Sequence, residues 1–303
     1  MSRETLRLVA SPLLASLALA ACSAPEPPAG EFPPVSHDAA VAEDASARDA
    51  SASAELVPDG TWLVWNETST CVKVLSTELE SVTETLLLAK LESSPGGVVR
   101  VTSRACLIEQ TPIVGVATSM PLALVETIPS TSYVALLGGT APGSAYTTQR
   151  VIELWGLRLT EPEIEPLPKD ASDPRVYDQD HDGNPGVTLV LGDGQCSMYV
   201  VQRAIAEWSG AVESATRIAG TGSNLTRQVV LGATGGFCSS QYQTRNPPGS
   251  ARFALERIDG LHGALDLDTN HDGELDCAEV RAYGTAAFGP RAPDNARCVA
   301  GGD

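Results

Sequence analysis

The sequence has few of the features that mark an enzyme or a nucleic-acid-binding protein. Aromatic residues make up 5% of the 303 residues, and only four histidines are present. The sequence contains no G-x-S-x-G elbow, H-E-x-x-H pair, phosphate-binding loop or dinucleotide-binding glycine pattern. Lys and Arg number 20 against 38 Asp and Glu, and binding to a phosphate backbone needs an excess of basic side chains. We therefore expect neither an enzyme nor a nucleic-acid partner.

Long apolar runs are also rare, and the one at the N-terminus is too short to span a bilayer. Residues 8–21 are apolar or small, and they follow a basic start that contains Arg3 and Arg7. A bilayer span needs about 20 apolar residues, whereas a basic start before a shorter apolar run is typical of a secretion signal. We expect residues 1–21 to be a signal peptide that is removed after export.

The end of this run indicates how the exported chain is held. Leu19-Ala20-Ala21-Cys22 resembles the lipobox of bacterial lipoproteins, whose cysteine becomes the acylated first residue of the mature chain. The alternative is an ordinary signal that is cut after small residues. The resemblance implies a lipid anchor on Cys22. Ser23 stands where an Asp would retain the protein in the inner membrane, so the resemblance implies the outer membrane, on its periplasmic or its cell-surface face.

The mature chain is predicted to begin with a tether. Removing residues 1–21 takes away two Arg and one Glu, which leaves 18 basic and 37 acidic residues. Residues 22–57 are rich in Ala, Ser, Pro, Glu and Asp, and Phe32 is their one aromatic residue. A segment of this composition cannot bury a core. We expect residues 22–57 to be a disordered tether.

The cysteines predict disulfides and argue against a metal ribbon. The sequence contains no C-x-x-C pair, so zinc-ribbon and thioredoxin-like sites have little support. Six cysteines remain after Cys22, which is an even number in an oxidising compartment, so three disulfides are expected. Sequence alone cannot choose the pairing. Nearness along the chain favours three pairs, which are Cys71 with Cys106, Cys196 with Cys238, and Cys277 with Cys298.

From Gly60 onward, alternating apolar and polar residues between turn-forming residues predict strands. The predicted strands cover residues 61–75, 82–91, 98–108, 132–137, 147–159, 187–191, 196–208, 214–218, 225–233 and 252–258. One short helix is predicted after Pro121, because proline suits the start of a helix. The predicted fold class is mainly β, an antiparallel barrel-like or sandwich body over residues 58–258. It forms one part, or two parts that divide near residues 160–177.

The C-terminal segment, residues 259–303, contains the strongest motif. Residues 268–279 read D-T-N-H-D-G-E-L-D-C-A-E and match the EF-hand loop at every position. Calcium takes about six to eight oxygen ligands, which such a loop supplies from alternate positions. The resemblance implies calcium ligands at Asp268, Asn270, Asp272, Glu274 through its backbone carbonyl, Asp276 and Glu279. An acidic surface turn without a metal is the alternative.

The flanks of this loop predict an incomplete EF-hand. Residues 277–283 are predicted to form the outgoing helix, which Gly284 ends. The incoming side contains Gly260 and Gly263, and glycine is a poor helix former. We therefore expect a short helix after the loop and a poor one before it, which makes the hand incomplete.

A weaker copy of the motif occurs at residues 178–186, which read D-Q-D-H-D-G-N-P-G. It lacks an acidic residue at position twelve, where Leu189 stands, and it resembles the short calcium turns of secreted β-proteins. The predicted calcium ligands are Asp178, Asp180, Asp182 and Asn184, with Asp173 or Asp193 as further candidates. The alternative is a turn whose Asp and Asn side chains bind only their own backbone.

These features support two hypotheses of function. Residues 173–188 also resemble a segment of uncharacterised myxobacterial lipoproteins, which implies no activity. The first hypothesis is a calcium-binding, lipid-anchored cell-envelope protein, in which calcium is structural and the domain contacts another macromolecule. The alternative is a β-barrel that binds a small apolar ligand. The strand count and the four tryptophans suggest it, although tryptophans also serve as core residues.

Overall fold

The computed structural model describes residues 55–74, 76–235, 244–247 and 249–299. The predicted signal peptide, the predicted lipidation site Cys22 and the predicted tether up to residue 54 lie outside the described residues, as does Cys238. Within the described ranges, no helix combines the length and the apolar character that crossing a membrane requires.

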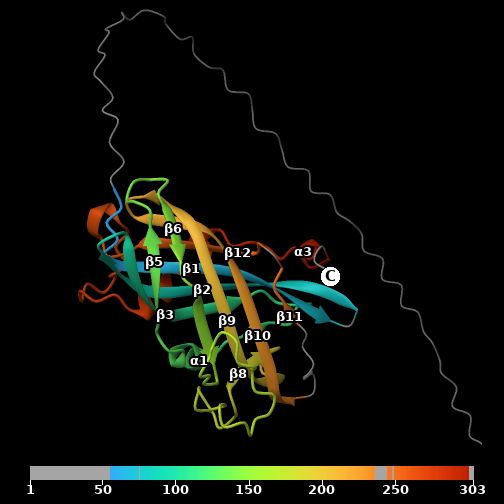
Figure 1. Cartoon of the computed structure of the whole chain (residues 1–303). Coiled ribbons are helices and arrows are strands. Elements are labelled where there is room, and N and C mark those ends of the chain that lie inside the picture. Colours follow the sequence, from blue (N-terminus) through green and yellow to red (C-terminus); the bar gives the residue numbers. More distant parts are fainter. Residues whose placement is uncertain (1–54, 75, 236–243, 248, 300–303) are drawn as a thin grey trace, which may run out of the picture. The chain divides into compact units, whose positions relative to one another are not determined.

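The described chain is mainly β-strand with a few short helices (Figure 1). The strands are β1 (Gly60–Val74), β2 (Thr77–Ser94), β3 (Val98–Gln110), β4 (Thr118–Ser119), β5 (Thr131–Leu137), β6 (Ala145–Thr148), β7 (Val151–Trp155), β8 (Val187–Leu191), β9 (Cys196–Ser214), β10 (Arg217–Gly235), β11 (Thr244–Arg245) and β12 (Ala251–Arg257). The helices are α1 (Leu122–Thr127), α2 (Cys277–Tyr283) and α3 (Ala296–Val299), with 3-10 turns η1 (Leu261–Gly263) and η2 (Ala286–Phe288). The helices predicted after Pro121 and over residues 277–283 are confirmed.

Eight of the strands close into an antiparallel ring. The order around the ring is β1, β2, β3, β5, β6, β9, β10, β12 and back to β1. Every step of this ring is an antiparallel pairing. Closure pairs the edges that an open sheet would leave free. The prediction of a mainly β, antiparallel body is confirmed, and of its two forms the ring is the barrel-like one.

Strand β9 pairs with four other strands. Along one edge, Cys196–Ser214 pairs with β10 over its whole length. Its other edge pairs in turn with β8, β7 and β6. Gly210 and Gly220 face each other in the β9–β10 register, and a Cβ added at Gly220 would lie 2.4 Å from the Gly210 Cα. Glycine at these two positions therefore permits the close approach of the two backbones.

Two of the predicted strands are wrong in detail. The strand predicted over residues 214–218 is the end of β9 and the start of β10, interrupted by a tight turn at residues 215–216, where the Thr216 N–H donates to Ser214 Oγ at 3.2 Å. The strand predicted over residues 147–159 is two strands, β6 and β7, interrupted at Gln149 and Arg150. The Gln149 N–H donates to the Val134 carbonyl at 3.0 Å. The first error arises because a serine side chain stabilises the turn. The second arises because β6 pairs with both β5 and β9, whereas β7 pairs with β9.

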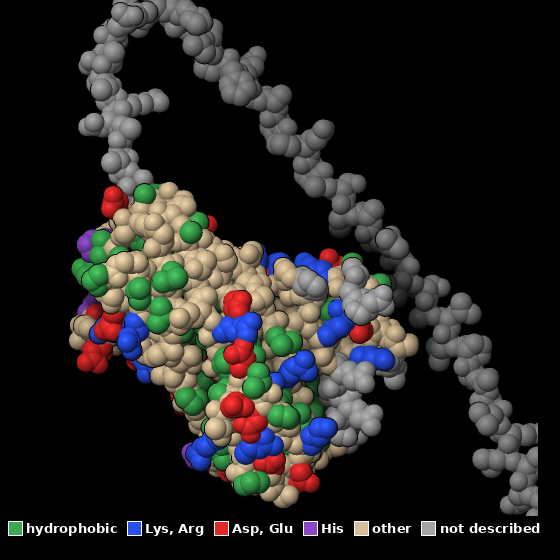
Figure 2. All heavy atoms as spheres, viewed as in Figure 1, with side chains coloured by type: hydrophobic (Ala, Val, Ile, Leu, Met, Phe, Trp, Pro, Cys, Tyr) green, Lys and Arg blue, Asp and Glu red, His purple; other side chains and the backbone are tan. Residues whose placement is uncertain are grey.

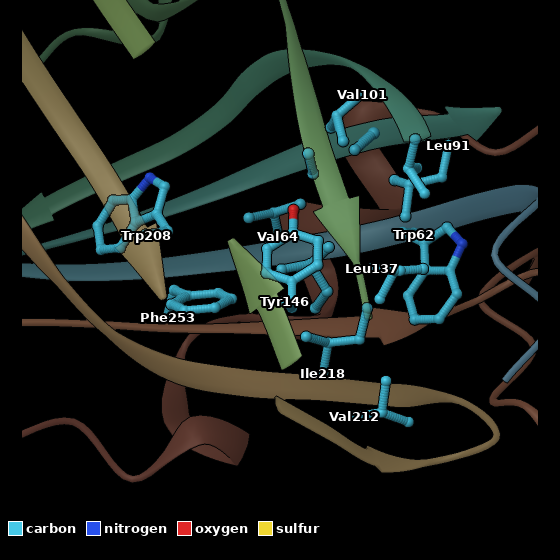
Figure 3. Packing of buried hydrophobic residues seen from close by; sticks show 14 of the residues in the cluster. Trp62, Val64, Leu91, Val101, Leu137, Tyr146, Trp208, Val212, Ile218 and Phe253 are labelled. Carbon is cyan, nitrogen blue, oxygen red and sulfur yellow. The ribbon is translucent and has the colours of Figure 1, made fainter. Parts of the chain in front are cut away.

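One end of the ring is filled by a hydrophobic core to which all eight ring strands contribute (Figure 3). The Phe253 ring lies 5.7 Å from Tyr146 and 5.5 Å from Trp208, measured between ring centroids. Leu56, which the sequence assigned to the tether, is 2% exposed in this core, and its N–H donates to the Thr140 carbonyl. The packed body therefore begins before residue 58.

The C-terminal segment, residues 259–299, packs against the outer face of the ring. Its apolar side chains join a cluster with Trp65, Leu86 and Cys106. Phe288 stacks on Trp65 with ring centroids 5.3 Å apart and planes 6° apart. Basic and acidic side chains lie interspersed on the face shown in Figure 2. The segment that contains residues 268–279 is thus part of the folded body.

Two disulfides join this segment to the ring, and they correct the predicted pairing. Cys71 pairs with Cys298, and Cys106 pairs with Cys277. The predicted pairs Cys71–Cys106 and Cys277–Cys298 are therefore wrong. The strands that carry Cys71 and Cys106 form the surface on which the C-terminal segment lies, so each cysteine meets a distant partner. The third predicted pair, Cys196–Cys238, includes a residue outside the described ranges.

Candidate functional site

A cavity of about 550 Å³ lies inside the ring. Side chains of a strand point alternately to its two faces, and on β1 one set of alternate residues lines the cavity: Val64, Asn66, Thr68, Thr70 and Val72. The residues between them, such as Trp65 and Glu67, lie beneath the C-terminal segment. The cavity volume falls within the range of about 300–1,000 Å³ that is usual for small-molecule sites.

The cavity lining is a mixture of apolar and neutral polar side chains. Its apolar side chains include Val64, Leu87, Ile108, Met120, Trp155, Leu189, Leu191, Met198 and Trp208. Its neutral polar side chains include Asn66, Thr68, Thr70, Thr83, Thr85, Ser103, Gln110, Thr131, Gln202, Asn224, Thr226 and Gln228. Among the described residues that line it, Glu153 alone carries a formal charge. This surface suits a small molecule with both apolar and hydrogen-bonding parts.

Glu153 lies on β7, on the same face as Val151 and Trp155. Its Oε1 accepts a hydrogen bond from Trp155 Nε1 at 2.5 Å. Burial raises the pKa of Glu153, because removal from water penalises the charged carboxylate, and the Trp155 N–H offsets part of this effect. The side chain is half-buried by surface area, which we attribute to its position at the cavity wall. A carboxyl group is thus held inside the ring next to empty space.

Asn66 adds an unsatisfied acceptor at the cavity wall. Its Oδ1 is buried and has no hydrogen-bond partner among the described residues. Asn66 itself lines the cavity. Most buried polar atoms in folded proteins have a partner, so this oxygen is an exception in the wall of the cavity.

The loop between β3 and β4 links the cavity to the surface. Ile113 and Val116 form an isolated antiparallel bridge, which makes this loop a small hairpin. Val114 is 72% exposed and Val116 is 45% exposed, yet both also line the cavity. Val114 and Val116 therefore lie where the wall of the cavity reaches the surface of the protein.

The acidic loop of residues 178–186 brings together three of its predicted ligands. Asp178, Asp180 and Asp182 each place an oxygen within 4.8 Å of the others. Asp178 accepts hydrogen bonds from the Asp182 and Gly183 N–H groups, at 3.2 and 2.9 Å. Asp180 Oδ1 is buried without a hydrogen-bond partner among the described residues. A cation bound between the three carboxylates would satisfy this oxygen.

The other predicted ligands of this loop have different roles. Asn184 donates its backbone N–H to Asp182 Oδ1 at 2.8 Å. Asp173 pairs with Arg175 through two side-chain hydrogen bonds, at 2.9 and 2.7 Å. These hydrogen bonds lower the pKa of Asp173 to about 2. Neither Asp173 nor Asp193 belongs to the carboxylate group that the structure forms.

The loop of residues 268–279, called the second loop below, begins with the same local backbone geometry as the loop of residues 178–186, called the first loop. His271 and His181 both have φ of 58°, and Gly273 and Gly183 follow with φ of 84° and 88°. Asp268 accepts the Asp272 and Gly273 N–H groups at 3.1 and 2.9 Å, which repeats the pattern at Asp178. The similarity of the two sequence motifs therefore extends to their backbone structure.

The second loop does not gather its carboxylates as closely. Among the described residues, Asp178, Asp180 and Asp182 form the only group of at least three such ligands within 4.8 Å. The two oxygens of Glu279 accept the Thr269 and Asp276 N–H groups at 2.9 and 3.1 Å. Asp276 in turn caps α2 through the Ala278 and Glu279 N–H groups. The remaining predicted ligands, Asn270 and Glu274, are exposed.

The first acidic loop is attached to the cavity wall. Gln179 is 3% exposed, and its Oε1 accepts the Gly156 N–H at 2.7 Å. The Thr188 N–H, on β8, donates to Asp180 Oδ2 at 2.8 Å. The loop therefore holds the end of β7 and the start of β8, and both strands line the cavity.

Sequence reasoning raised a ligand-binding barrel but did not identify Glu153 or the other residues that line the cavity. The signal for Glu153 was its position within V-I-E-L-W, where period-two alternation places it on the face of Val151 and Trp155. The cavity itself depends on how distant strands pair. No protein-family model, curated protein or solved structure matches this chain.

Proposed function

We propose that the protein binds a small molecule inside its strand ring and is held at the cell envelope by the predicted lipid on Cys22. The observation that carries the proposal is the cavity of about 550 Å³ inside the ring. This proposal widens the second hypothesis that the sequence raised, a β-barrel that binds a small apolar ligand. Contact with another macromolecule stays a prediction from sequence.

The filling of the ring supports this function. Closed sheets of about eight strands have an interior that side chains fill or that holds one small ligand. Here one end is filled by aromatic and aliphatic side chains, whereas the cavity takes up the space beside Trp155 and Trp208. Burial of a ligand's apolar surface there would contribute about 25 cal/mol per Å² before the costs of association.

The test is to extract and identify what the protein carries. Protein purified from its native membrane should release a small molecule that mass spectrometry detects in roughly equal molar amount. Ala204→Phe should abolish this ligand, because Ala204 lines the cavity and a ring there would fill it. Leu225→Phe, at a position that is 45% exposed, is the control and should keep the ligand. An empty wild-type protein would refute the proposal.

A second candidate function is calcium binding with a structural role. It is supported by the three carboxylates of residues 178–182 and by the buried, unpartnered Asp180 Oδ1. The matching backbone of residues 268–279 extends the candidate to the second loop. Calcium at the first loop would fix the strands beside the cavity, and calcium at the second would fix the C-terminal segment. In this role the ion stabilises the ligand-binding body.

Calcium should raise the melting temperature, and a chelator should lower it. At free calcium about ten times the dissociation constant, occupancy stabilises the fold by roughly 1.4 kcal/mol per site. Extracellular calcium modules typically bind at about 10⁻⁴ to 10⁻³ M. Asp180→Asn should reduce the calcium-dependent shift at the first loop, and Asp268→Ala or Glu279→Gln should reduce it at the second.

Glu126→Gln is the matched control for these variants, because Glu126 is exposed on α1 and lies outside both loops. It removes one negative charge and should leave the calcium-dependent shift unchanged. Differential scanning calorimetry with and without a chelator measures the shifts. Equal shifts in wild type and all three loop variants would exclude calcium from both loops.

A further inference from the structure

From the charge distribution inside the ring, we infer that the cavity selects ligands that carry a positively charged amine, with the Glu153 carboxylate as the counter-charge. This inference rests on the proposed function and adds the chemical class of the ligand. The class is a small amphipathic amine, whose ammonium group meets Glu153 and whose apolar part lies against the tryptophans and aliphatic side chains of the cavity.

The charge balance of the cavity carries the first step. No Lys or Arg occurs among the described residues that line it, and Glu153 is their only formal charge. Trp155 is the only hydrogen-bond partner of Glu153 in the described part of the chain. An anionic ligand would be repelled by Glu153 and would find no cation. A cationic ligand would supply the opposite charge that this half-buried carboxylate lacks among the described residues.

The strand register provides the room for such a group. Glu153 lies directly opposite Ala204 in the β7–β9 pairing, and Val151 lies opposite Ala206. Ala204 and Ala206 both line the cavity. Because alanine side chains are short, they leave space beside the Glu153 carboxyl that a larger residue would fill. The hydrogen bond from Trp155 Nε1 engages Oε1 and leaves Oε2 available to a ligand.

The rest of the lining limits what the amine is attached to. Trp155, Trp208 and Met198 present apolar surface, which favours an aliphatic or aromatic body over a polyamine. The threonine, asparagine and glutamine side chains are neutral and accept or donate hydrogen bonds. One cationic group and an otherwise uncharged body therefore match the cavity.

The experiment compares three probes with one chain and three head groups: octylamine, 1-octanol and octanoate. Each is titrated at neutral pH into the folded mature protein, and binding is followed by calorimetry. Tryptophan fluorescence provides a second measurement, because Trp155 and Trp208 line the cavity. Octylamine should bind at least about tenfold more tightly than 1-octanol. Octanoate should show no saturable binding.

Variants of Glu153 separate charge from shape. Glu153→Gln keeps an acceptor for the Trp155 N–H and removes the charge. Octylamine should then bind this variant no better than 1-octanol does. The affinity for 1-octanol should be the same in the variant as in wild type. Glu153→Asp keeps the charge and should retain the preference for the amine. Glu92→Gln removes a charge that is 54% exposed on the surface, and it should alter none of the three affinities.

The outcomes distinguish this inference from the proposed function. If none of the three probes binds wild-type protein, the ligand-binding proposal itself fails. If 1-octanol and octylamine bind equally, or if octanoate binds as well as they do, the cavity binds ligands but the amine preference is wrong. A Glu153→Gln variant that keeps the full preference for octylamine would also overturn the role of Glu153.

Discussion

Removing the disulfide between Cys71 and Cys298 is expected to lower the free energy of unfolding by about 4 kcal/mol. The two cysteines are 227 residues apart, and with the Cys106–Cys277 bond intact the loop that their bond closes runs through residues 71–106 and 277–298. In the chain-entropy description, a longer loop restricts the unfolded chain more and stabilises the folded state more. The double variant Cys71→Ala/Cys298→Ala avoids free thiols and can be measured by urea denaturation.

The second disulfide provides the comparison. Cys106 and Cys277 are 171 residues apart, so Cys106→Ala/Cys277→Ala should cost a similar amount. In both double variants, the amide hydrogens of the C-terminal segment should exchange faster than those of the ring, because the segment loses a covalent attachment. A loss below about 1 kcal/mol in either variant would contradict the prediction, since it would show that the bond constrains little of the unfolded chain.

Replacing Glu67 with Gln is expected to cost about 3–5 kcal/mol, the usual effect of breaking a buried ion pair. The Glu67 side chain is fully buried between Arg252 and Arg291. Arg252 Nη2 donates to it at 2.6 Å, and the Arg291 backbone N–H donates at 2.8 Å. The contact between Glu67 and Arg291 joins β1 to the chain that follows α2, so loss of the charge should weaken the attachment of the C-terminal segment.

The same pair predicts a dependence of stability on pH. Burial alone would raise the pKa of Glu67, but the hydrogen bonds and charges of Arg252 and Arg291 lower it below 4.5. A lowered pKa means that the stabilisation is present above about pH 4.5 and is lost as the pH falls through the pKa of the folded state. Urea denaturation from pH 7 to pH 3 should therefore show a loss in wild type that is smaller in Glu67→Gln.

The Lys90–Glu92 pair serves as the control, because its side chains are 69% and 54% exposed. Glu92→Gln should change the free energy of unfolding by less than about 1 kcal/mol. If Glu67→Gln is as mild as Glu92→Gln, the buried pair contributes little to stability, and the proposed pH dependence fails with it.

Local signals in the sequence predicted the local structure well. Helix α2 begins and ends where it was expected, because Asp276 caps its start and Gly284 follows its end with φ of 74°. The mainly β, antiparallel character followed from period-two alternation. The strand predicted over residues 214–218 failed because the turn there uses Ser214 and Thr216 and contains no glycine, proline or asparagine to mark it.

Features that depend on distant residues were not predictable from one sequence. Nearness along the chain suggested that Cys71 pairs with Cys106, but the partners lie in the C-terminal segment. Glu153 has the pattern of an ordinary strand residue until the ring closes around it. The cavity is lined by residues of β7, β8 and β9, among other strands, and no local pattern encodes the pairing of β9 with both of the others.

Ring closure has a consequence for the order of folding. The first strand of the ring, β1, pairs with the last, β12, so that Trp62 lies opposite Arg257. Contacts between residues so far apart in the chain form slowly, and an unpaired strand edge is open to aggregation until they form. The Cys106–Cys277 disulfide cannot form before residue 277 has been synthesised, and the Cys71–Cys298 disulfide cannot form before residue 298 has been.

Until then, the reactive neighbour of Cys71 along the chain is Cys106. A bond between these two is the early, non-native product that oxidation of the incomplete chain favours. Reaching the native pairing from that product requires thiol–disulfide exchange, which is slow without a catalyst. We therefore expect a disulfide isomerase to accelerate oxidative refolding of the reduced chain in vitro.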